Sequence, residues 1–252
     1  MVRTRVIPCL LLKNNGFYKT HKFKRPKYLG DPINILKIFN EKEVDEICIL
    51  DIDATINKSG PNMDLLLDMA SECFMPLSYG GGITNIEQMK KLFYFGFEKI
   101  VLNTAAYKDP DLVGQAADIF GSQSVVVSVD VKKKLFGKYE VFIRGGRGKT
   151  GLSPEEYAQM LEKKGAGEIV LNSIDNDGTK SGYDLELIKK VANVIDIPVI
   201  ACGGASGVND FKKAVDSGAS AVGAGAMFVF HGPHNAVLIN TPTRDAIMKV
   251  LK

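Results

Sequence analysis

Residues 75–83 read MPLSYGGGI, and residues 197–205 read IPVIACGGA. Each stretch is a short, nearly continuous apolar run that ends in glycines, and such runs are typical of strands buried on both faces of a parallel sheet. The second stretch starts 122 positions after the first. The same offset relates other identical residues: Glu46 and Glu168, Ile52 and Ile174, Asp53 and Asp175, Ser59-Gly60 and Ser181-Gly182, Lys90-Lys91 and Lys212-Lys213, and Gly96 and Gly218. We therefore expect the chain to consist of two halves with the same order of strands, helices and turns.

Apolar runs and helix-period segments alternate along the chain. Eight runs are typical of buried strands, at 6–12, 47–52, 75–79, 99–102, 124–129, 168–171, 198–201 and 219–223. Eight amphipathic segments separate or follow them, at 31–43, 63–72, 85–95, 109–120, 154–164, 185–194, 208–217 and 244–251. Several have good cap chemistry; Ser153 is the expected N-cap before Pro154 as the first helical residue. Eight β–α units predict an α/β fold, a (β/α)8 barrel, with a doubly wound open sheet as the alternative.

The two halves have no linker between them. We therefore expect one domain over residues 1–252, with half-barrels of approximately 1–122 and 123–252 closed into a single barrel. A chain of 252 residues that is 45% hydrophobic is long enough to bury a large core.

Composition excludes several classes of protein. The net charge is only +3, and the basic blocks KFKR at 22–25 and KKK at 132–134 are short, so solvated loops are favoured over nucleic-acid binding. The first apolar run is too short for a signal peptide, and no stretch is long enough to span a membrane, so a cytoplasmic protein is expected. The cysteines, Cys9, Cys48, Cys73 and Cys202, have no metal or disulfide spacing and are interpreted as buried, reduced thiols.

Glycine-rich turns recur at matching places in both halves. YGGGI (79–83) and CGGAS (202–206) follow the third strand of each half, and the small-residue stretches LNTAA (102–106) and AGAMF (224–228) follow the fourth. Glycine allows backbone amides to approach an anion, and a following helix N-terminus adds positive potential. One such turn is weak evidence, because glycines often only turn the chain. Two copies predict two phosphate sites on opposite sides of the barrel mouth, and an elongated ligand with a phosphate at each end.

Six stretches together resemble one known family. They are RVIPCLLLK, YGGGI, LNTAA, FGSQSVVVSVD, GAGEIVLNSIDNDGTKSGYDLELI and IPVIACGGA. The chain is similar over nearly its whole length to the cyclase subunit of imidazole glycerol phosphate synthase. That resemblance implies a (β/α)8 barrel without a cofactor, paired as a heterodimer with a glutaminase subunit at the barrel bottom. Ammonia from the partner passes through the barrel. At the mouth it reacts with a bisphosphorylated ribulosyl aminoimidazole carboxamide nucleotide, giving imidazole glycerol phosphate and an aminoimidazole carboxamide ribotide.

The resemblance also implies roles for individual residues. Four charged residues form the family's ammonia gate near the barrel bottom, although ion pairs that only close the barrel base are the alternative. Glu98 and Gln123 match positions near the partner interface. The gate residues are Arg5, Glu46, Lys99 and Glu168. The phosphate binders are Gly81, Gly82, Asn103 and Thr104 on one side, and Asp177, Gly178, Gly203, Gly204, Gly225 and Ala226 on the other; Thr179 adds a hydroxyl beside the second group.

The catalytic carboxylates depart from the family pattern. The family uses two aspartates for acid–base work; here Asp130 remains, and Leu11 stands where the first is expected. Lys19, in the expected loop after the first strand, matches a lysine that the family uses there. Asp53, near the end of the second strand, is a candidate substitute carboxylate or simply a turn residue. Losing one of two acid–base groups costs roughly 10²–10⁴ in rate. The cyclase activity of this chain itself is therefore expected to be weak or absent.

The C-terminal stretch FVFHGPHNAVLIN (228–240), with IPCLLLK and LDIDA, resembles a divergent branch of the family found with surface-polysaccharide or flagellar sugar genes. The resemblance implies ammonia delivery to a third, ATP-using sugar amidotransferase that converts an N-acetyl group to an acetamidino group. A working cyclase of histidine biosynthesis and a phosphosugar isomerase are the alternatives. His231 and His234 lack a nearby third ligand, so a loop is favoured over a metal site.

Overall fold

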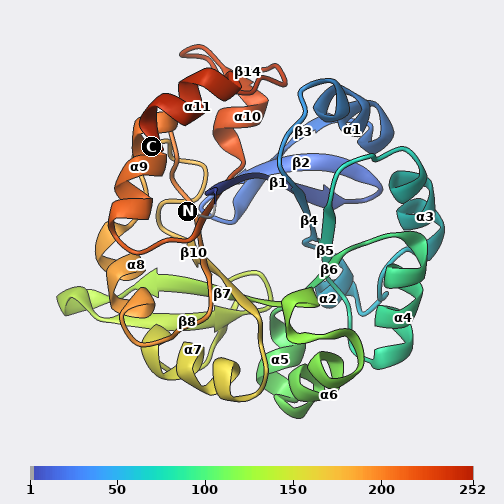
Figure 1. Cartoon of the computed structure of the whole chain (residues 1–252), viewed down its shortest axis with the longest axis vertical. Helices are drawn as coiled ribbons and strands as arrows, with labels where there is room; N and C mark the ends of the chain where they lie inside the picture. Colours follow the sequence, from blue (N-terminus) through green and yellow to red (C-terminus); the bar gives the residue numbers. More distant parts are fainter. Residues whose placement is uncertain (1–2, 252) are drawn as a thin grey trace.

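Eight parallel strands form a closed ring in the computed structural model, which describes residues 3–251 (Figure 1). Strand β7 pairs with both β6 and β10, and the β7–β10 pairing completes the ring. The predicted (β/α)8 barrel is confirmed, and the open sheet is wrong. The ring consists of β1 (Arg5–Lys13), β4 (Ile47–Asp51), β5 (Leu77–Gly80), β6 (Lys99–Leu102), β7 (Val125–Lys133), β10 (Glu168–Ser173), β11 (Val199–Cys202) and β12 (Ala221–Ala224).

Helices cover the outside of this ring (Figure 1). Each of the eight predicted helical segments contains a helix whose bounds agree to within a few residues. They are α1 (Pro32–Glu41), α3 (Met63–Ser71), α4 (Ile86–Phe95), α6 (Asp111–Phe120), α7 (Pro154–Lys163), α8 (Leu185–Ala192), α9 (Val208–Asp216) and α11 (Arg244–Val250). The predicted cap is confirmed: Ser153 and Glu156 form a reciprocal capping box at the start of α7.

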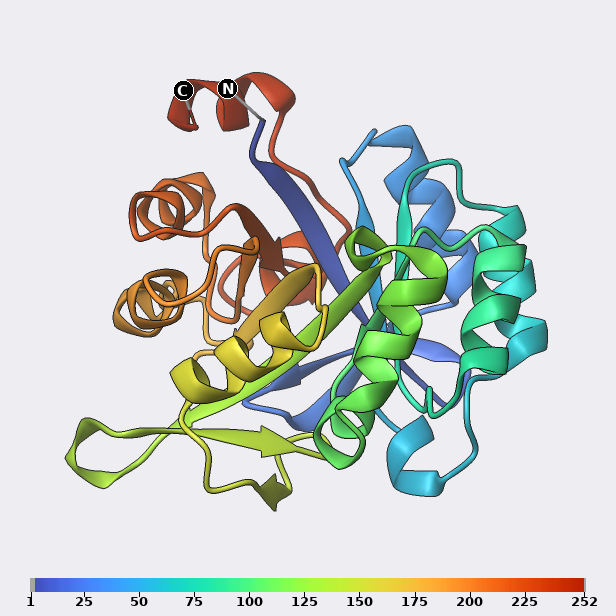
Figure 2. The same cartoon turned by 60° about the horizontal axis from the view of Figure 1, so that its bottom comes forward.

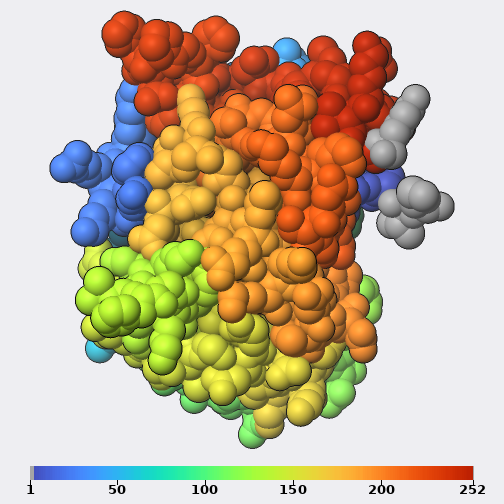
Figure 3. All heavy atoms as spheres, turned by 90° about the vertical axis from the view of Figure 1, so that its left-hand side faces the viewer, coloured from blue at the N-terminus to red at the C-terminus, as the bar shows by residue number. Residues whose placement is uncertain are grey.

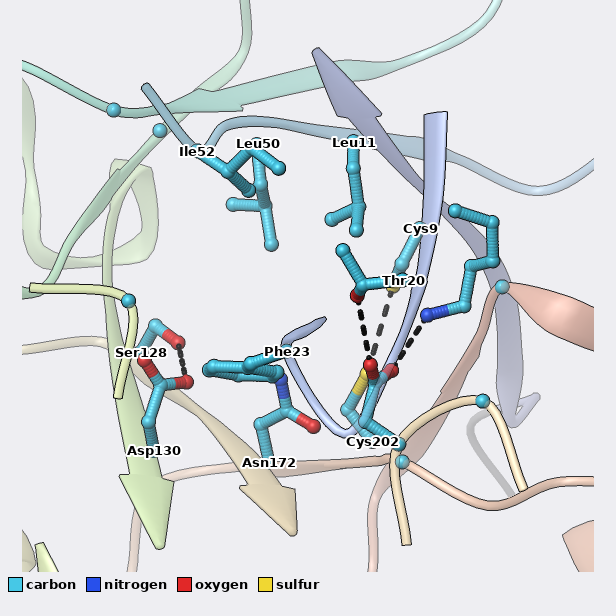
Figure 4. Close-up of a pocket in the computed structure, with 18 of the residues that line it drawn as sticks. Cys9, Leu11, Thr20, Phe23, Leu50, Ile52, Ser128, Asp130, Asn172 and Cys202 are labelled. Atoms are coloured by element: carbon cyan, nitrogen blue, oxygen red, sulfur yellow. Dashed lines mark hydrogen bonds and ion pairs between the residues drawn. The ribbon is translucent and has the colours of Figure 1, made fainter. Parts of the chain in front are cut away.

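Side chains of the barrel strands alternate between two environments. On β1, Leu10 and Leu12 point outward into the large core beneath the helices, whereas Ile7 and Cys9 belong to a smaller apolar cluster inside the ring. This alternation continues upward, so that Leu11 faces the interior at the mouth of the barrel (Figure 4). A one-residue shift of register would exchange the two sets.

Antiparallel strands extend the barrel beyond the predicted elements. The segment after β1 was expected to be a loop, but it forms β2 (Gly16–His21) and β3 (Lys24–Gly30), and Lys19 lies in β2. Strand β7 continues past the ring and turns through the 3₁₀ segment η2 (Leu135–Gly137) into β8 (Tyr139–Ile143), which projects from the barrel in Figure 2. The others are β9 (Gly148–Lys149), beside β8, and the pair β13 (Phe230–His231) and β14 (Ala236–Val237).

Short helices mark the mouth of the barrel. They are α2 (Ala54–Asn57), α5 (Thr104–Lys108) and α10 (Ala226–Val229). At the opposite end, a 3₁₀ turn, η1 (Ser122–Ser124), precedes β7. The helices α5 and α10 begin at the small-residue stretches predicted to face the Gly turns. Among residues 3–251, no helix is long and apolar enough to cross a bilayer.

Candidate active site

A cavity of about 210 Å³ opens at the carboxyl ends of the strands. All eight barrel strands, or the turns that follow them, contribute to its lining. Figure 4 shows its two unlike walls: Leu11, Leu50 and Ile52 on one side, and Ser128 and Asp130 on the other. This is the end of a (β/α)8 barrel at which ligands bind.

Two glycines of each Gly turn have positive φ. Gly81 and Gly82 have φ of 123° and 70°, and Gly203 and Gly204 have φ of 92° and 110°. A Cβ on Gly81 would lie 2.4 Å from the carbonyl oxygen of Asp51, so no side chain fits. Both pairs therefore keep the chain in a left-handed conformation with its backbone close to the cavity.

The same neighbours enclose both turns. A Cβ on Gly203 would lie 2.6 Å from the carbonyl oxygen of Ser173, which is 122 positions after Asp51. Likewise, Gly82 packs against Gly60, and Gly204 against Gly182. The offset seen in the sequence thus reappears as matching atomic contacts around both turns.

Nine of the ten predicted phosphate binders line the cavity; Gly82 does not. The amide of Gly82 donates to Thr55 Oγ1 at 3.2 Å, so it is already engaged. Thr104 Oγ1 donates to Asn103 Oδ1 at 3.2 Å and accepts from the amide of Arg144 at 3.0 Å. Thr179, predicted to offer its hydroxyl, instead donates it to the carbonyl of Asn176 at 2.7 Å.

Asp130 is buried at the centre of a polar network. Ser128 Oγ donates to Asp130 Oδ1 at 3.2 Å, and Asn103 Nδ2 donates to Asp130 Oδ2 at 3.2 Å. Burial raises the pKa of Asp130 to about 7, and the charge of Asp177 adds to this increase. Hydrogen bonds from Ser128, Asn172 and Asn103 oppose it. The carboxyl group therefore titrates near neutral pH, where a general acid or base works best.

Leu11 lies across the cavity from Asp130 (Figure 4). It is paired with Leu50 in the β1–β4 register, and together with Ile52 these side chains form an apolar wall. Phe23, from the turn between β2 and β3, lies above the cavity between the walls (Figure 4). Since a leucine cannot exchange a proton, this wall offers no acid–base partner to Asp130.

Asp53, the candidate substitute carboxylate, is ion-paired. Its Oδ2 lies 2.5 Å from Lys13 Nζ, and its amide donates to Asp51 Oδ1 at 2.9 Å. Asp51 also lines the cavity, and burial raises its pKa. Both carboxylates are thus near the mouth, but Asp53 is held by Lys13. Its role as a substitute for Leu11 stays a prediction.

Lys19 connects the β2–β3 hairpin to the opposite side of the cavity. Its Nζ lies 2.6 Å from Asp177 Oδ1, and Thr20 Oγ1 donates to Asp177 Oδ2 at 3.0 Å. The amide of Lys22 donates to the carbonyl of Asp177 at 2.8 Å. Lys19 is only 5% exposed, so this pair is shielded from water. The contacts hold the hairpin over the mouth.

Four charges form a ring at the other end of the barrel. Arg5 reaches Glu46 Oε2 at 2.6 Å and Glu168 Oε1 at 2.7 Å. Lys99 reaches Glu46 Oε2 at 3.2 Å and Glu168 Oε2 at 3.1 Å. Each cation therefore contacts both carboxylates. Burial lowers the pKa of Arg5, but the two carboxylates outweigh it, so that the pKa is raised.

A second cavity, of about 10 Å³, lies inside the barrel between this ring and the mouth. Its lining includes Glu46 of the ring as well as Cys9 and Val101, and the latter two also line the large cavity. Its volume is close to that of one water-sized probe. All four cysteines are free, as predicted; Cys9, Cys48 and Cys202 are buried inside the barrel, but Cys73, also predicted to be buried, is only partly buried.

Comparisons with known proteins agree on one family. A family model described as histidine biosynthesis protein matches residues 5–234. A Pseudomonas aeruginosa protein provisionally named imidazole glycerol phosphate synthase subunit hisF2 is 53% identical over 96% of this chain and 97% of its own length. The imidazole glycerol phosphate synthase subunit HisF of Alkaliphilus metalliredigens is 41% identical over 92% of both chains.

The chain belongs to the HisF family. A Leptospira interrogans relative with the same provisional naming is 47% identical over 97% of both chains. The resemblance predicted from the sequence motifs is thus confirmed at the level of the family.

Two further predicted site residues lie at the base. Glu98 and Gln123, predicted to approach a partner, are both exposed at the end where the charged ring lies; Glu98 directly precedes β6, and Gln123 lies in η1 just before β7. Phe74 and Tyr94, which the sequence did not single out, are 88% and 89% exposed on the same end. Their positions after α3 and at the end of α4 could have placed them at the base from the sequence alone, because helices of the barrel end there.

Some mouth residues of this HisF-family chain were missed from sequence. Asn172 lies opposite Asp130 in the β7–β10 register, and its buried Oδ1 has no hydrogen-bond partner among the described residues. Ser128 and Lys180 also line the cavity. Polar residues at the carboxyl end of a barrel strand face the mouth, so this rule could have found Asn172 and Ser128. His231 and His234 are exposed, and no cluster of metal-binding side chains exists within residues 3–251.

Proposed function

We propose that this HisF-family chain is the synthase-side subunit of a glutamine amidotransferase complex. A glutaminase subunit docks at the base and releases ammonia into the barrel. The ammonia crosses the interior and leaves at the mouth. There it is passed to a separate ATP-using sugar amidotransferase, which converts an N-acetyl group to an acetamidino group.

One observation carries the proposal: a charged ring, a small internal cavity and the mouth cavity follow one another along the barrel axis. Glu46 lines the small cavity from the ring side, and Cys9 lines both cavities. The intervening side chains, such as Val126 and Val170, are apolar. Neutral ammonia passes an apolar interior at little cost, whereas ammonium is strongly disfavoured there.

The ring supports a gate more than a structural plug. Buried ion pairs are often no better for stability than apolar residues of similar volume. Both Lys99 contacts, at 3.1 and 3.2 Å, are longer than those of Arg5. Lysine also has a flexible stem with a single terminal charge. Movement of Lys99 on docking of the partner is therefore the simplest way to open the ring.

The base also supports a partner interface. Phe74 and Tyr94 expose large aromatic surfaces there, at the same end of the barrel as Glu98. Aromatic residues with a polar rim are typical of protein–protein interfaces. We propose that this surface, with Gln123, receives the glutaminase.

Leu11 favours delivery of ammonia over cyclisation by this chain. The carboxylate that would pair with Asp130 is absent from the apolar wall, and Asp53 is held by Lys13. The alternative, a working cyclase of histidine biosynthesis, is favoured by the near-neutral pKa of Asp130 and by the two Gly turns, which suit a ligand with two phosphates.

An assay of the purified chain with ammonium salts and the bisphosphorylated nucleotide distinguishes delivery of ammonia from cyclisation. We expect cyclase turnover far below the order of 1 s⁻¹ that is ordinary for enzymes. A turnover at or above that value contradicts the delivery proposal and establishes the cyclase. The control is binding of the glutaminase to the same preparation, which shows that the chain is folded and active in docking.

A further inference from the structure

Two lysines from distant parts of the chain converge at the rim of the cavity. Lys27 lies in β3, and Lys180 lies in the segment after β10. Lys27 Nζ donates to the carbonyl oxygen of Asn235 at 2.8 Å, and Lys180 Nζ donates to Asn235 Oδ1 at 2.9 Å. Both ammonium groups also lie over the ring of Phe230, 5.1 and 5.8 Å from its centroid. Figure 3 shows the blue, light-orange and red segments that carry these residues meeting at one edge.

The two positive charges have no counter-charge in the protein. Within residues 3–251, neither Lys27 nor Lys180 forms an ion pair with a carboxylate. Their partners are the carbonyl oxygens of Asn235 and Phe230, the amide oxygen of Asn235 and the aromatic ring of Phe230. By contrast, Lys19 at the same mouth is neutralised by Asp177. Like charges held by one residue repel each other. Burial also lowers the pKa of Lys180, as expected for a cation without an anionic partner.

Lys180 links the lysine pair to the cavity of the second Gly turn. Lys180 lines the same cavity as Gly203 and Gly204, and it lies two residues after Gly178. Its backbone has φ of 56°, in the left-handed region that is unfavourable for a residue with a side chain. The hydrogen bond from Lys180 Nζ to Asn235 Oδ1 positions its ammonium group without a ligand.

We propose that Lys27 and Lys180 form a second anion-binding site, the outer site, directly outside the inner site at the Gly203–Gly204 turn. This end of the cavity would then bind a diphosphate. Backbone amides of the turn receive the inner phosphate, and the two ammonium groups neutralise the outer one. Lysine is well suited to this as a mobile point charge with three donors. For its inner site the inference rests on the predicted phosphate site at the Gly203–Gly204 turn, and not on the proposed delivery of ammonia.

Calorimetric titration of the full chain with inorganic phosphate and with pyrophosphate tests the proposal. In Lys27→Met and Lys180→Met, loss of a charge-assisted hydrogen bond should weaken pyrophosphate binding by about tenfold or more. Phosphate binding at the inner turn should change by less than about threefold, the effect of a weak, screened charge. Lys24→Met is the matched control, since it removes a lysine from the same strand, β3, that is exposed. It should leave both affinities within that threefold range.

The charge-conserving variant Lys180→Arg separates binding from folding. It should keep pyrophosphate binding, and all variants should retain the melting temperature of the parent to within a few degrees. Equal weakening of phosphate and pyrophosphate binding would overturn the outer anion site. Unchanged pyrophosphate binding in folded Lys27→Met and Lys180→Met would also overturn it. So would an absence of pyrophosphate binding in the parent chain. None of these readouts involves ammonia, so failure here leaves the delivery proposal to be judged by its own experiment.

Discussion

Glu46 and Glu168, 122 positions apart in the sequence, share the same two cations at the base of the barrel. Arg5 and Lys99 each bridge from one carboxylate to the other. The repeat thus contributes one acidic residue per half, while the cations come from positions that the repeat does not relate. The ring becomes a single unit only when β1, β4, β6 and β10 meet.

Removing Lys99 should separate glutamine hydrolysis from ammonia transfer. Lys99→Met removes one of the two cations of the charged ring. Without it the ring no longer closes normally, so ammonia escapes at the base instead of entering the barrel. We expect glutamine-driven product formation to fall by at least about tenfold, equivalent to ~1.4 kcal/mol. Ammonium-driven product formation should be unchanged. Both rates are measured in the assembled complex with its acceptor enzyme.

Lys90→Met is the control for that experiment. Lys90 forms an exposed pair with Glu87 on α4, and such pairs contribute little. Coupling in this variant should equal that of the parent. Normal coupling in Lys99→Met would reduce the ring to ion pairs that close the barrel base.

Asp130 should make stability depend on pH. Its pKa of about 7 lies above the ordinary value of 3.8, so the folded state binds the proton more tightly than the unfolded state. Below pH 4 the group is protonated in both states and costs nothing. Stability is then lost as the pH rises from about 4 to about 7, by an amount on the order of 4 kcal/mol. Urea unfolding at pH 5 and pH 8 measures the part of this loss that falls between those values, about 2–3 kcal/mol.

Asp130→Asn supplies the comparison. The amide keeps the shape of the side chain but does not titrate. We expect this variant to be more stable than the parent at pH 8 and to show a flatter pH profile. A parent and variant with parallel profiles between pH 5 and pH 8 would contradict the raised pKa.

Leu11→Asp should restore a trace of cyclase activity. The new carboxylate faces Asp130 across the cavity, where Leu11 now faces it (Figure 4). If the missing group alone limits the reaction, turnover of the bisphosphorylated nucleotide with ammonium salts should increase by at least about tenfold, within the 10²–10⁴ typical of acid–base groups. Leu11→Asn is the control, because it adds polarity without a titrating group. Equal rates in the two variants would show that more than one difference separates this site from a cyclase.

Gly204→Ala should abolish anion binding at the second turn. Gly204 has φ of 110°, and an added Cβ would lie 2.1 Å from the carbonyl oxygen of Gly182. The backbone must shift, at a cost of at least about 1–3 kcal/mol. Phosphate titration and thermal unfolding measure both effects. Gly207→Ala is the matched control three residues on, since nothing lies within 4 Å of its added Cβ. A Gly204→Ala variant with parental phosphate affinity argues against an anion seat at this turn.

Much of the architecture was predictable because it depends on local patterns. Buried strands and amphipathic helices have recognisable periods, and Ser153 begins a helix through contacts within four residues. The hairpin that carries Lys19 was missed, since β3 is exposed and the buried side chains of β2 include the polar Lys19 and Thr20, so that neither strand shows an apolar alternation. Its strands are stabilised instead by pairing with β1 and by contacts such as Lys19 to Asp177.

The sequence by itself determined the number of β–α units, the positions of the two Gly turns and the absence of a carboxylate at Leu11, because each is a property of one residue or of a short segment. The tertiary structure alone decided that Asn172 lies opposite Asp130, that Asp53 is held by Lys13, and that Lys27 and Lys180 meet at Asn235. These contacts join residues far apart in the chain. Barrel closure and register bring such residues together, and no local period encodes either.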